Sequence, residues 1–503
     1  MSIGHDPAVV SPRAVWRDPL LVGVIAFIVA VAASWVPSYW SDEATTLQAA
    51  RLPLADLIAF LNQRDGVHTV YYVFIHVWIG AFGESEFATR LPSAIATAIG
   101  ASGVLVLTRM LTTRTTALLA AGIYIVLPRI TLEAVEARPY ALTAALAVWL
   151  TVLLLVASRR QQRRWWVAYG IGLAVTIITF VPLALIILVH GVFLGLAPAQ
   201  RRRRGARHRL LGWTVSTVGA LLVSLPMIIR VLGERSRLMG RGDPSTSASV
   251  TWWTILVEPW FASGGAFAVV SAVLLIVLGT RLRDRSRTPG SVVLLGALWV
   301  VGPTAMLLLL GIVLAPVYQA RLLTYAAPGM ALLLAVAITG RRRRWVAISL
   351  ICVLVAASAP TYVLQRQPAA KGGGSDLSRL SSYIEHQARP GDAFYLDASG
   401  MVSTRPRQAL YAYPSRFAGL DDVAFLRSGT AEGAYSDRTL VLDDPNQVEE
   451  LRTRLESVDR LWVARLSVDA LSEGDISTLR SLGFSVAQEH TTGRSIVYLL
   501  MRR

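Results

Sequence analysis

Residues 19–45 read PLLVGVIAFIVAVAASWVPSYWSDEAT, an uncharged apolar run followed at once by a polar stretch that contains Asp42 and Glu43. The run covers residues 19–37, the length that a helix needs to cross a bilayer core of about 30 Å. Its small residues at 31–34 also offer a signal-peptide cleavage site, but the run is long for a signal core. We therefore predict a retained helix that holds two carboxylates at a membrane surface.

Ten more apolar stretches of similar length follow before residue 364. Eleven crossings place the two chain ends on opposite sides of the membrane. The predicted spans lie near 19–37, 91–108, 115–131, 139–157, 165–181, 182–198, 210–229, 259–279, 291–313, 322–340 and 345–363.

The composition excludes a disordered chain and disfavours an ordinary soluble enzyme. The 503 residues are 54% hydrophobic and only 16% charged, whereas a soluble domain is about one quarter charged. The net charge of +17 is of the kind that attracts nucleic acid. All of this excess lies in the apolar part, however, because residues 364–503 have a net charge of −1 and residues 1–363 of +18. We therefore expect no nucleic-acid partner.

The arginines predict the orientation of the chain in the plasma membrane. With the N-terminus in the cytoplasm, the cytoplasmic segments hold 22 arginines and three acidic residues. The outer segments of residues 1–363 hold ten arginines and eleven acidic residues. Because cytoplasmic loops are enriched in Lys and Arg, we predict a multi-pass protein with a cytoplasmic N-terminus and an extracytoplasmic C-terminal domain.

Two outer segments are long. The first covers residues 38–90 and contains a short apolar piece, Val70–Phe82, that we interpret as a helix lying at the interface. The second, 364–503, begins with a Gly-rich linker at Lys371–Ser375. The fold class is thus a polytopic helical domain, 1–363, followed by an α/β domain, 364–503. In the latter we expect helices at 377–387 and 448–458 and strands at 393–396, 439–442, 461–464 and 495–500.

Asp42 and Glu43 are the first candidates for chemistry. Two adjacent carboxylates at a membrane surface are costly unless they are solvated, paired or used. The structural alternative is a helix start, with Ser41 or Asp42 as N-cap and acids in the first turn. Capping and catalysis are compatible.

A second candidate group lies between the third and fourth predicted spans, also on the outer side. Glu133 and Glu136 are three residues apart and would share a helix face, and Arg138 and Tyr140 follow directly. The structural alternative is an interfacial salt-bridge cluster of Glu133, Glu136 and Arg138, with Pro139 opening the next helix.

The first outer segment adds polar and aromatic candidates between these two groups. They are Asp65, His68, Tyr71, Tyr72 and His76. For His76 we favour an ordinary hydrogen-bonded surface or core residue.

Arg321 stands at the outer mouth of the tenth predicted span. It either extends towards lipid headgroups or holds a lipid phosphate through paired hydrogen bonds. Each candidate alone is a weak indication, but all of them collect on the outer face around one long loop.

The order of these motifs resembles the GT-C membrane glycosyltransferases, in particular the branch with the protein O-mannosyltransferases and the lipid A aminoarabinose transferase, including the actinobacterial mannosyltransferase-like proteins. The resemblance covers roughly residues 15–340. Thr69-Val70 replaces two prolines of the family's HPPLYY segment, and the C-terminal domain matches no family that we can name. The motifs that carry it are Asp42-Glu43, His68 to Tyr72 followed by Trp78, the stretch from Gly83 to Ser93, and Glu136 to Tyr140.

The resemblance implies transfer of a sugar, mannose above all, from a polyprenyl-phosphate donor to a lipid, glycan or protein acceptor at the outer face of the membrane. Asp42 would be the general base, with Glu43 as its catalytic neighbour, and attack opposite the phosphate would invert the anomeric carbon. The cofactor is left open: a divalent metal, if one is used, would bind Asp42 and Glu43. The resemblance assigns donor-phosphate binding to Arg138, Arg321, Tyr71 and Tyr72, and substrate positioning to His68, Glu133, Glu136 and Tyr140.

Two other classes of function compete with this interpretation. A transporter or flippase would need charges near the bilayer midplane and repeated halves, whereas the ionisable residues here lie at span ends. A binding protein anchored by its helices would not need eleven spans. For the C-terminal domain, we weigh acceptor binding or capping of the active-site mouth equally against a role in stability or assembly.

Overall fold

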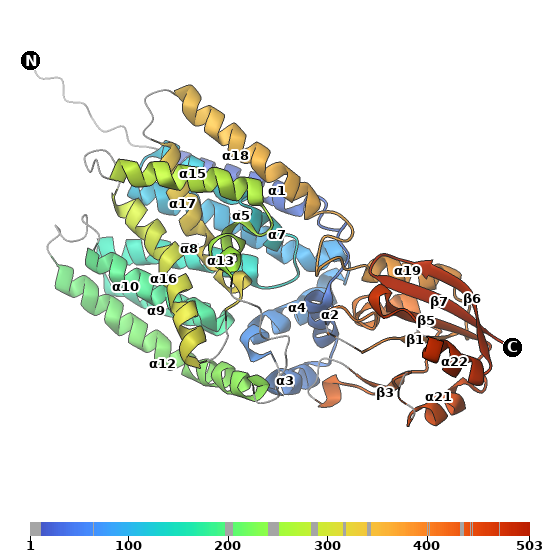
Figure 1. Cartoon of the computed structure of the whole chain (residues 1–503). Coiled ribbons are helices and arrows are strands. Elements are labelled where there is room, and N and C mark those ends of the chain that lie inside the picture. The colour runs from blue at the N-terminus through green and yellow to red at the C-terminus, as the bar shows by residue number, and fades with distance from the viewer. Residues whose placement is uncertain are drawn as a thin grey trace, which may run out of the picture.

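The protein consists of a bundle of helices with a small sheet domain at one end (Figure 1). The computed structural model describes residues 12–63, 65–196, 205–239, 251–282, 290–314, 318–339, 344–399, 401, 403–432, 437–442, 444, 446–471 and 473–503.

Each of the eleven predicted spans falls on a helical segment. Seven of these segments, within the described ranges, are long and apolar enough to cross a membrane: Glu86–Leu111, Tyr140–Arg160, Arg207–Gly233, Gly265–Leu282, Gly290–Ile312, Ala320–Ile338 and Trp345–Leu364. The eleven segments are α1 (Pro12–Val31), α5 (Glu86–Leu111), α6 (Arg114–Val126), α8 (Tyr140–Arg160), α9 (Arg163–Thr179), η2 (Val181–Leu185) with α10 (Ile186–Leu196), α12 (Ala206–Met239), α15 (Gly265–Leu282), α16 (Gly290–Leu314), η4 (Ala320–Ala326) with α17 (Ala327–Ile338), and α18 (Arg344–Leu364).

Three predicted spans are shorter in the structure because the helix ends or breaks inside them. The helix predicted for 19–37 ends at Val31, before Ala33 with its left-handed φ of 55°. The helix predicted for 115–131 ends at Val126, since Pro128 disfavours helical backbone in the residue before it. A new short helix, α7 (Pro128–Glu133), starts at that proline. The helix predicted for 259–279 breaks at Ala262, whose φ of 48° is left-handed, so that α14 (Glu258–Phe261) is separate from α15. Before it lies α13 (Trp252–Leu256).

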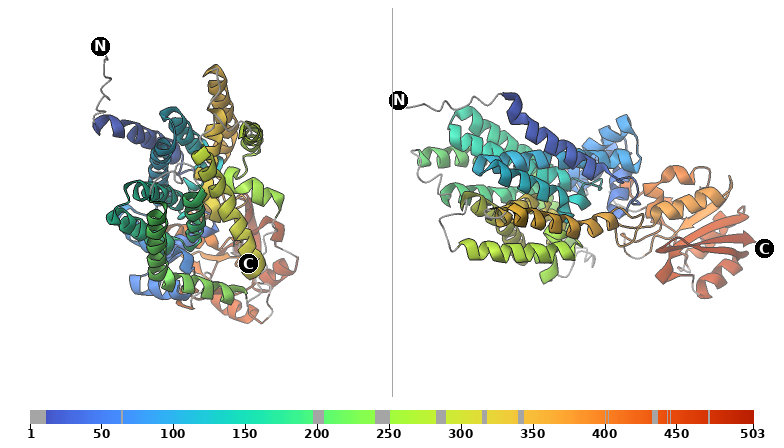
Figure 2. Two further views of the ribbon diagram at one scale, coloured as in Figure 1. Left: turned by 90° about the vertical axis from the view of Figure 1, so that its left-hand side faces the viewer. Right: turned by 90° about the horizontal axis from the view of Figure 1, so that it is seen from above.

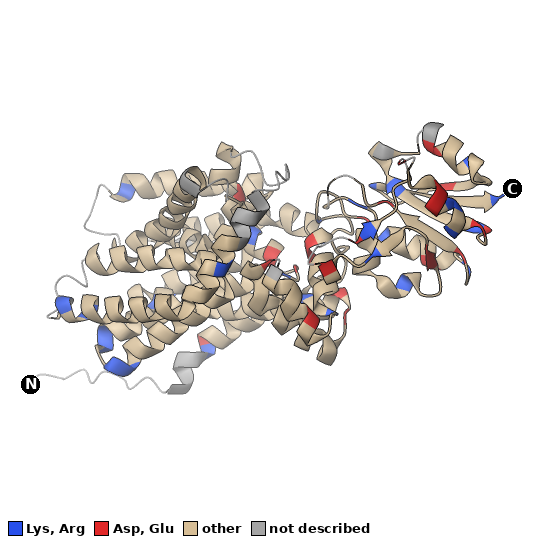
Figure 3. Ribbon diagram, turned by 90° about the horizontal axis from the view of Figure 1, so that it is seen from below, with Lys and Arg blue, Asp and Glu red and all other residues tan. Residues whose placement is uncertain are grey.

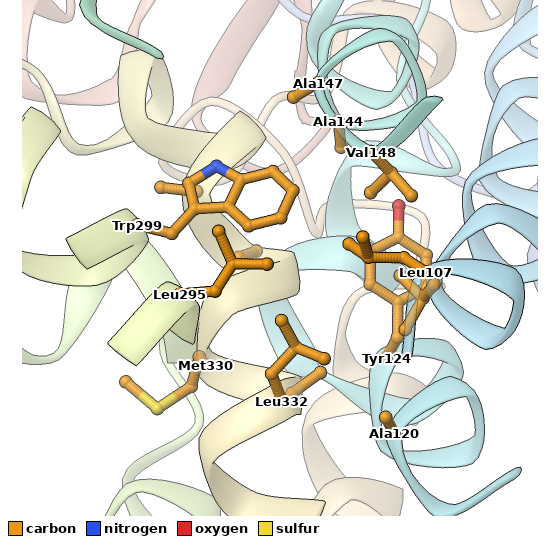
Figure 4. Close-up of a cluster of buried hydrophobic side chains, with 14 of the residues drawn as sticks. Leu107, Ala120, Tyr124, Ala144, Ala147, Val148, Leu295, Trp299, Met330 and Leu332 are labelled. Carbon is orange, nitrogen blue, oxygen red and sulfur yellow. The ribbon is translucent and has the colours of Figure 1, made fainter. Parts of the chain in front are cut away.

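The core of the bundle is formed by aliphatic and aromatic side chains from α5, α6, α8, α16 and α17 (Figure 4). Trp299 of α16 is fully buried there. Helices α16 and α17 approach closely because glycines face each other: a Cβ on Gly329 would lie 2.8 Å from the Trp299 Cβ and 3.0 Å from the Gly296 carbonyl oxygen. Small residues at such contacts let membrane helices pack by van der Waals contact.

The first outer segment folds into three short helices and one turn of 3-10 helix on the end of the bundle near the sheet domain (Figure 1). The segment Val70–Phe82, for which a helix was predicted, is helical. These elements are α2 (Ser41–Ala50), α3 (Leu54–Gln63), η1 (Gly66–His68) and α4 (Thr69–Phe82).

The C-terminal domain is a five-stranded mixed sheet with helices on both faces. The strand order is β2-β1-β5-β7-β6; β1 pairs in parallel with β2 and β5, and β7 pairs antiparallel with β5 and β6. A two-stranded ribbon, β3-β4, stands apart. The elements are α19 (Leu377–Gln387), β1 (Ala393–Leu396), α20 (Gln408–Ala412), η5 (Pro414–Phe417), β2 (Asp421–Asp422), β3 (Phe425–Arg427), η6 (Thr430–Glu432), β4 (Arg438–Thr439), α21 (Val448–Leu455), β5 (Arg460–Leu466), η7 (Ser467–Asp469), α22 (Glu473–Ser481), β6 (Phe484–Thr491) and β7 (Ser495–Arg502).

Five of the six elements predicted in this domain are present, three of them with changed bounds. The strand predicted at 439–442 is wrong, because β4 (Arg438–Thr439) overlaps it only at Thr439. The helix predicted at 448–458 ends at Leu455. Strands β5 and β7 extend beyond the predicted 461–464 and 495–500. The sequence did not predict β2 and β6, which are the two edge strands of the sheet.

Charge separates along the molecule. In Figure 3 several Lys and Arg residues of the helical part lie at the end far from the sheet domain, and many acidic residues lie where the two parts meet. The N-terminal end of the described chain lies at the basic end (Figures 1 and 2). This pattern agrees with the predicted crossing of a membrane between the two ends.

The C-terminal domain packs directly on α2. Tyr39, Ala44 and Leu47 share one apolar cluster with α19 and the face of the sheet that it covers. The Tyr413 hydroxyl accepts a hydrogen bond from the Tyr39 backbone N–H (3.1 Å) and donates one to Glu86 (2.8 Å). The helix that carries Asp42 and Glu43 is therefore held between the bundle and the sheet domain.

Candidate functional site

Asp42 and Glu43 lie in the first turn of α2. Trp40 occupies the N-cap position without a capping side-chain hydrogen bond, so the cap expected from Ser41 or Asp42 is not formed. Acidic residues in a first turn are stabilised by the partial positive charge of the helix N-terminus. The two carboxylates have different surroundings.

Asp42 is held by two arginines from distant parts of the chain. Its Oδ2 accepts hydrogen bonds from Nη2 of Arg138 (3.3 Å) and from Nη1 of Arg321. Its side chain keeps 23% of its surface exposed. Burial works to raise the pKa of Asp42, but the two guanidinium groups outweigh it and hold this pKa below its ordinary value.

Arg138 connects Asp42 with the first outer segment. Its buried guanidinium donates to the Thr46 hydroxyl (3.1 Å) and to the Tyr72 hydroxyl (3.0 Å). The Tyr72 hydroxyl in turn donates to the Asp65 carboxylate. The arginine is thus fixed from several sides and presents one edge to Asp42.

His68 lies behind this network among aromatic rings. It stacks on Phe180 (ring centroids 5.8 Å apart) and meets Tyr140 edge-on (6.0 Å). Burial lowers the pKa of His68 to about 4. The charge of Arg138 also lowers this pKa, whereas the charge of Asp65 raises it. The imidazole is therefore neutral near pH 7.

Glu43 is fully buried and used for ion pairing. Both of its oxygens accept hydrogen bonds from Arg90 at 2.8 Å, and Oε1 also accepts the backbone N–H of Ala137 at 2.8 Å. Burial opposes ionisation, but Arg90 and Lys371 lower the pKa of Glu43 to about 2. Glu43 joins α2 to α5 and to the segment before α8.

Lys371 comes from the segment that connects α18 to α19. Its buried ammonium lies 3.3 Å from Glu43 and 4.0 Å from Glu136. Gly372, with a φ of +54°, packs so closely on Trp40 that a Cβ would lie 2.8 Å from the Trp40 Cβ. The segment that leads to the sheet domain therefore completes the charge cluster of the helical part.

A cavity of about 400 Å³ lies beside this cluster. Glu133 and Glu136 line it together with Arg321, Lys371 and others. Burial raises the pKa of Glu136 to about 8, against the lowering effect of Lys371. The wall of the cavity thus holds a carboxyl group that is largely protonated near pH 7. The other lining residues are Trp40, Arg129, Leu132, Thr254, Glu258, Tyr318, Gln319, Ala320, Ala370 and Gly372.

The salt-bridge cluster of Glu133, Glu136 and Arg138 is not formed. Glu133 instead accepts a hydrogen bond from Arg129 (3.1 Å), Glu136 approaches Lys371, and Arg138 pairs with Asp42. Glu133 and Glu136 also do not share a helix, because α7 ends at Glu133. They meet at the cavity because the chain turns there.

The remaining candidates differ in how close they come to Asp42. Arg321 points inward, with its guanidinium 5.9 Å from the Tyr140 ring centroid and bonded to Asp42. Tyr71 packs in an apolar cluster with Ala50 and Ile75. His76 hydrogen-bonds the Ala50 carbonyl through Nδ1 (2.8 Å), as favoured for it above.

Asp42 and Glu43 do not fit a divalent metal in this arrangement. Asp42 Oδ2 faces two guanidinium groups, and both oxygens of Glu43 are bonded to Arg90, with Lys371 at Oε1. Within the described residues, no group of three or more His, Cys, Asp or Glu side chains is arranged to hold a metal ion. Divalent cations prefer several free oxygen ligands, which this pair does not offer.

Three basic residues received no role from the sequence although they shape the site: Arg90, Arg129 and Lys371. Arg90 is completely buried and also donates to the backbone carbonyls of Ser34 and Pro37, both at 2.7 Å. Lys371 was interpreted as part of a linker. Its being the only lysine of the chain is the one feature of the sequence that sets it apart.

Comparisons with known proteins agree with this architecture. Residues 69–229 match the family model for dolichyl-phosphate-mannose-protein mannosyltransferase. No curated protein matches the chain in sequence.

Among solved structures, the fold is similar to that of ArnT from Cupriavidus metallidurans. The apo form is 13% identical with a TM-score of 0.58, and the form bound to undecaprenyl phosphate is 14% identical with a TM-score of 0.57. Each comparison covers 95% of this chain and 97% of that chain.

A second similar structure is the oligosaccharyltransferase of Archaeoglobus fulgidus in complex with zinc and sulfate. It is 12% identical with a TM-score of 0.51, over 91% of this chain and 69% of that chain. The resemblance inferred from the sequence is therefore confirmed, and the chain has the fold of the GT-C membrane glycosyltransferases.

Proposed function

We propose that this protein is an inverting glycosyltransferase that moves a sugar, mannose above all, from a polyprenyl-phosphate donor to an acceptor hydroxyl at the outer face of the membrane. One observation carries the proposal: a carboxylate oxygen of Asp42 lies between the guanidinium groups of Arg138 and Arg321, next to a cavity of about 400 Å³. The structure of ArnT with undecaprenyl phosphate supports a lipid phosphate as the ligand class.

In the proposed mechanism, the donor phosphate displaces Asp42 from the two arginines. A phosphate ester is a better partner for paired guanidinium groups than a single carboxylate oxygen, because it offers several acceptor oxygens. Asp42 is then free to face the acceptor. In this structure the Asp42 carboxylate takes the position that we propose for the phosphate.

The transfer step needs one base and one stabilised leaving group. Asp42 takes the proton of the acceptor hydroxyl while the oxygen of that hydroxyl forms a bond to the anomeric carbon. The bond from this carbon to the phosphate oxygen breaks, and its electron pair leaves with the phosphate. Arg138 and Arg321 stabilise that charge. Attack from the face opposite the phosphate inverts the anomeric configuration.

The other residues of the cluster hold this geometry. Glu43 fixes the start of α2 through Arg90, and Tyr72 fixes Arg138. Glu136, largely protonated, would donate a hydrogen bond to a sugar in the cavity. We assign no step to a metal ion, because Glu43, the neighbour of Asp42, stays paired with Arg90 and Lys371.

A transfer assay tests the proposal. Membranes that contain the protein are given radiolabelled polyprenyl-phosphate mannose, and the label that leaves the donor is measured. We expect Asp42→Asn to lose about 10²- to 10⁴-fold in rate, the usual contribution of a general base. Asp56→Asn is the matched control, because Asp56 lies exposed on α3 of the same outer segment. Equal transfer by wild type and Asp42→Asn would refute the assignment of the base.

A further inference from the structure

We propose that the C-terminal domain carries a binding groove for the polyhydroxylated glycan acceptor of the reaction. The groove lies on the surface between α19 and the end of β6, outside the cavity described above, and has a volume of about 640 Å³. This inference rests on the proposed function, because it names the acceptor class and where the acceptor is held.

Polar groups line the groove throughout. Four serine and threonine hydroxyls are joined by Arg379, Tyr383, His386 and His490. The lining includes no aliphatic and no acidic side chain, so it matches neither an apolar chain nor a cation. A ligand with many hydroxyl groups offers both donors and acceptors to such a surface.

A flat aromatic platform forms one wall. The rings of Tyr383 and His490 stack with centroids 4.0 Å apart and an angle of 11° between their planes. Gln488 donates a hydrogen bond to the Tyr383 hydroxyl (2.8 Å), and Trp462 meets the Tyr383 ring edge-on. The platform is thus fixed before any ligand arrives, which reduces the entropy lost on binding.

The floor of the groove is tied to the start of α19. Asp376 accepts hydrogen bonds from the Thr492 hydroxyl (2.8 Å) and from the backbone N–H of Ser495 (2.7 Å). These contacts join the turn between β6 and β7 to the start of α19, the helix that carries Tyr383. Arg379 and His490 remain exposed at the rim.

The groove is close to the cavity of the helical part along the chain. Gly372 lines that cavity and Ser378 lines the groove. Six residues span at most about 20 Å. The connection is also fixed, because the Ser378 N–H donates to the Ser38 hydroxyl (3.0 Å) and the Ser375 hydroxyl to the Tyr39 carbonyl (2.7 Å). A glycan longer than a few sugar units could therefore bind in the groove and present its end to Asp42.

Binding of short linear manno-oligosaccharides, from dimers to hexamers, tests this proposal. The full chain in lipid nanodiscs is titrated by calorimetry without donor. We expect saturable binding that strengthens with chain length, and a rise in Kd of about tenfold in His490→Ala and in Arg379→Ala, as for the loss of a ligand hydrogen bond. Arg452→Ala is the matched control, because Arg452 lies on α21, which covers the opposite face of the sheet.

The outcomes separate this proposal from the proposed function. If wild type does not bind the saccharides, the proposed groove is refuted. It is also refuted if wild type and both groove variants bind them equally well. Full competition by inorganic phosphate also overturns it, since the groove would then be an anion site. Because the titration needs no donor, a chain without transferase activity that still binds the saccharides would refute only the proposed function. Transfer to a long acceptor with an unchanged acceptor KM in both groove variants would refute only the groove.

Discussion

At the scale of the residue, the central feature is one carboxylate between two guanidinium groups. Asp42, Arg138 and Arg321 come from three separate segments of the chain, and Arg321 lies 279 positions from Asp42. The Asp42 carboxylate thus lies where the phosphate of the proposed donor would bind. The arrangement also keeps the proposed base ionised over a wide pH range, because the arginines lower its pKa.

Removal of one arginine tests this arrangement. We expect Arg321→Met to lower kcat/KM for transfer by about 10²- to 10³-fold, the usual cost of one lost transition-state donor. The variant should also shift the acid limb of the pH–rate profile to higher pH. The reason is that Arg321 lowers the pKa of Asp42, and a base is active only above its own pKa. The measurement is kcat/KM of wild type and Arg321→Met between pH 4 and 9. An acid limb at the same pH in both proteins would contradict this account.

Glu136 gives a prediction for stability. In the folded protein the pKa of Glu136 is raised to about 8. Glu136 therefore stays protonated in the folded protein at pH values where it has already lost its proton in the unfolded chain. Glu136 therefore destabilises the fold increasingly as the pH rises from about 5 to 8. We expect Glu136→Gln, which does not titrate, to be more stable than wild type at pH 8, by a free energy of unfolding on the order of a few kcal/mol.

Thermal unfolding of the two proteins in detergent, measured from pH 5 to pH 9, checks this expectation. The difference in Tm should be small at pH 5 and should increase towards pH 8. A difference that is the same at every pH would mean that Glu136 is ionised in the fold.

At the scale of the element, the segment between α18 and α19 does more than link two parts. Lys371 places the only lysine of the chain beside Glu43 and Glu136, and Gly372 packs on Trp40. The charge cluster of the helical part is therefore incomplete without a residue that precedes the sheet domain.

Replacement of this lysine should destabilise both the cluster and its chemistry. We expect Lys371→Met to lower Tm and transfer, because the buried, ionised Glu43 loses one of its two cationic partners. In Lys371→Met combined with Glu136→Gln, the change in the free energy of unfolding should differ from the sum of the two single changes by about 1–3 kcal/mol, because Lys371 lies 4.0 Å from Glu136.

Unfolding of the two single variants and the double variant measures this coupling. Arg452→Met, an exposed cation on α21, serves as the control and should behave as wild type. Strictly additive effects of Lys371→Met and Glu136→Gln would show that the two side chains do not interact.

At the scale of the whole molecule, hydropathy and charge predicted most of the architecture. Runs of apolar residues located all eleven helical segments, because the period and length of a spanning helix depend on local sequence. The corrections came from single residues that act on the backbone, such as Pro128, which ends α6 early, and Ala262, which separates α14 from α15. The sequence also indicated Asp42, Arg138 and Arg321, which the structure brings together.

The pairing within the site was less predictable. Glu43 and Lys371 are 328 positions apart, and Asp42 and Arg321 are 279 apart. Local patterns carry no information on such contacts, which depend on how the helices pack. For the same reason the sequence did not predict that Glu43 is buried against Arg90, or that the segment before the sheet domain would contact the cluster.

The most direct test of the central claim is the position of the donor phosphate in an electron cryo-microscopy map of the full chain with polyprenyl-phosphate bound. We predict phosphate density within hydrogen-bond distance of the guanidinium groups of Arg138 and Arg321, with the Asp42 carboxylate released from both and turned towards the cavity. Phosphate density elsewhere, with the bonds from Asp42 to Arg138 and Arg321 intact, would contradict the account.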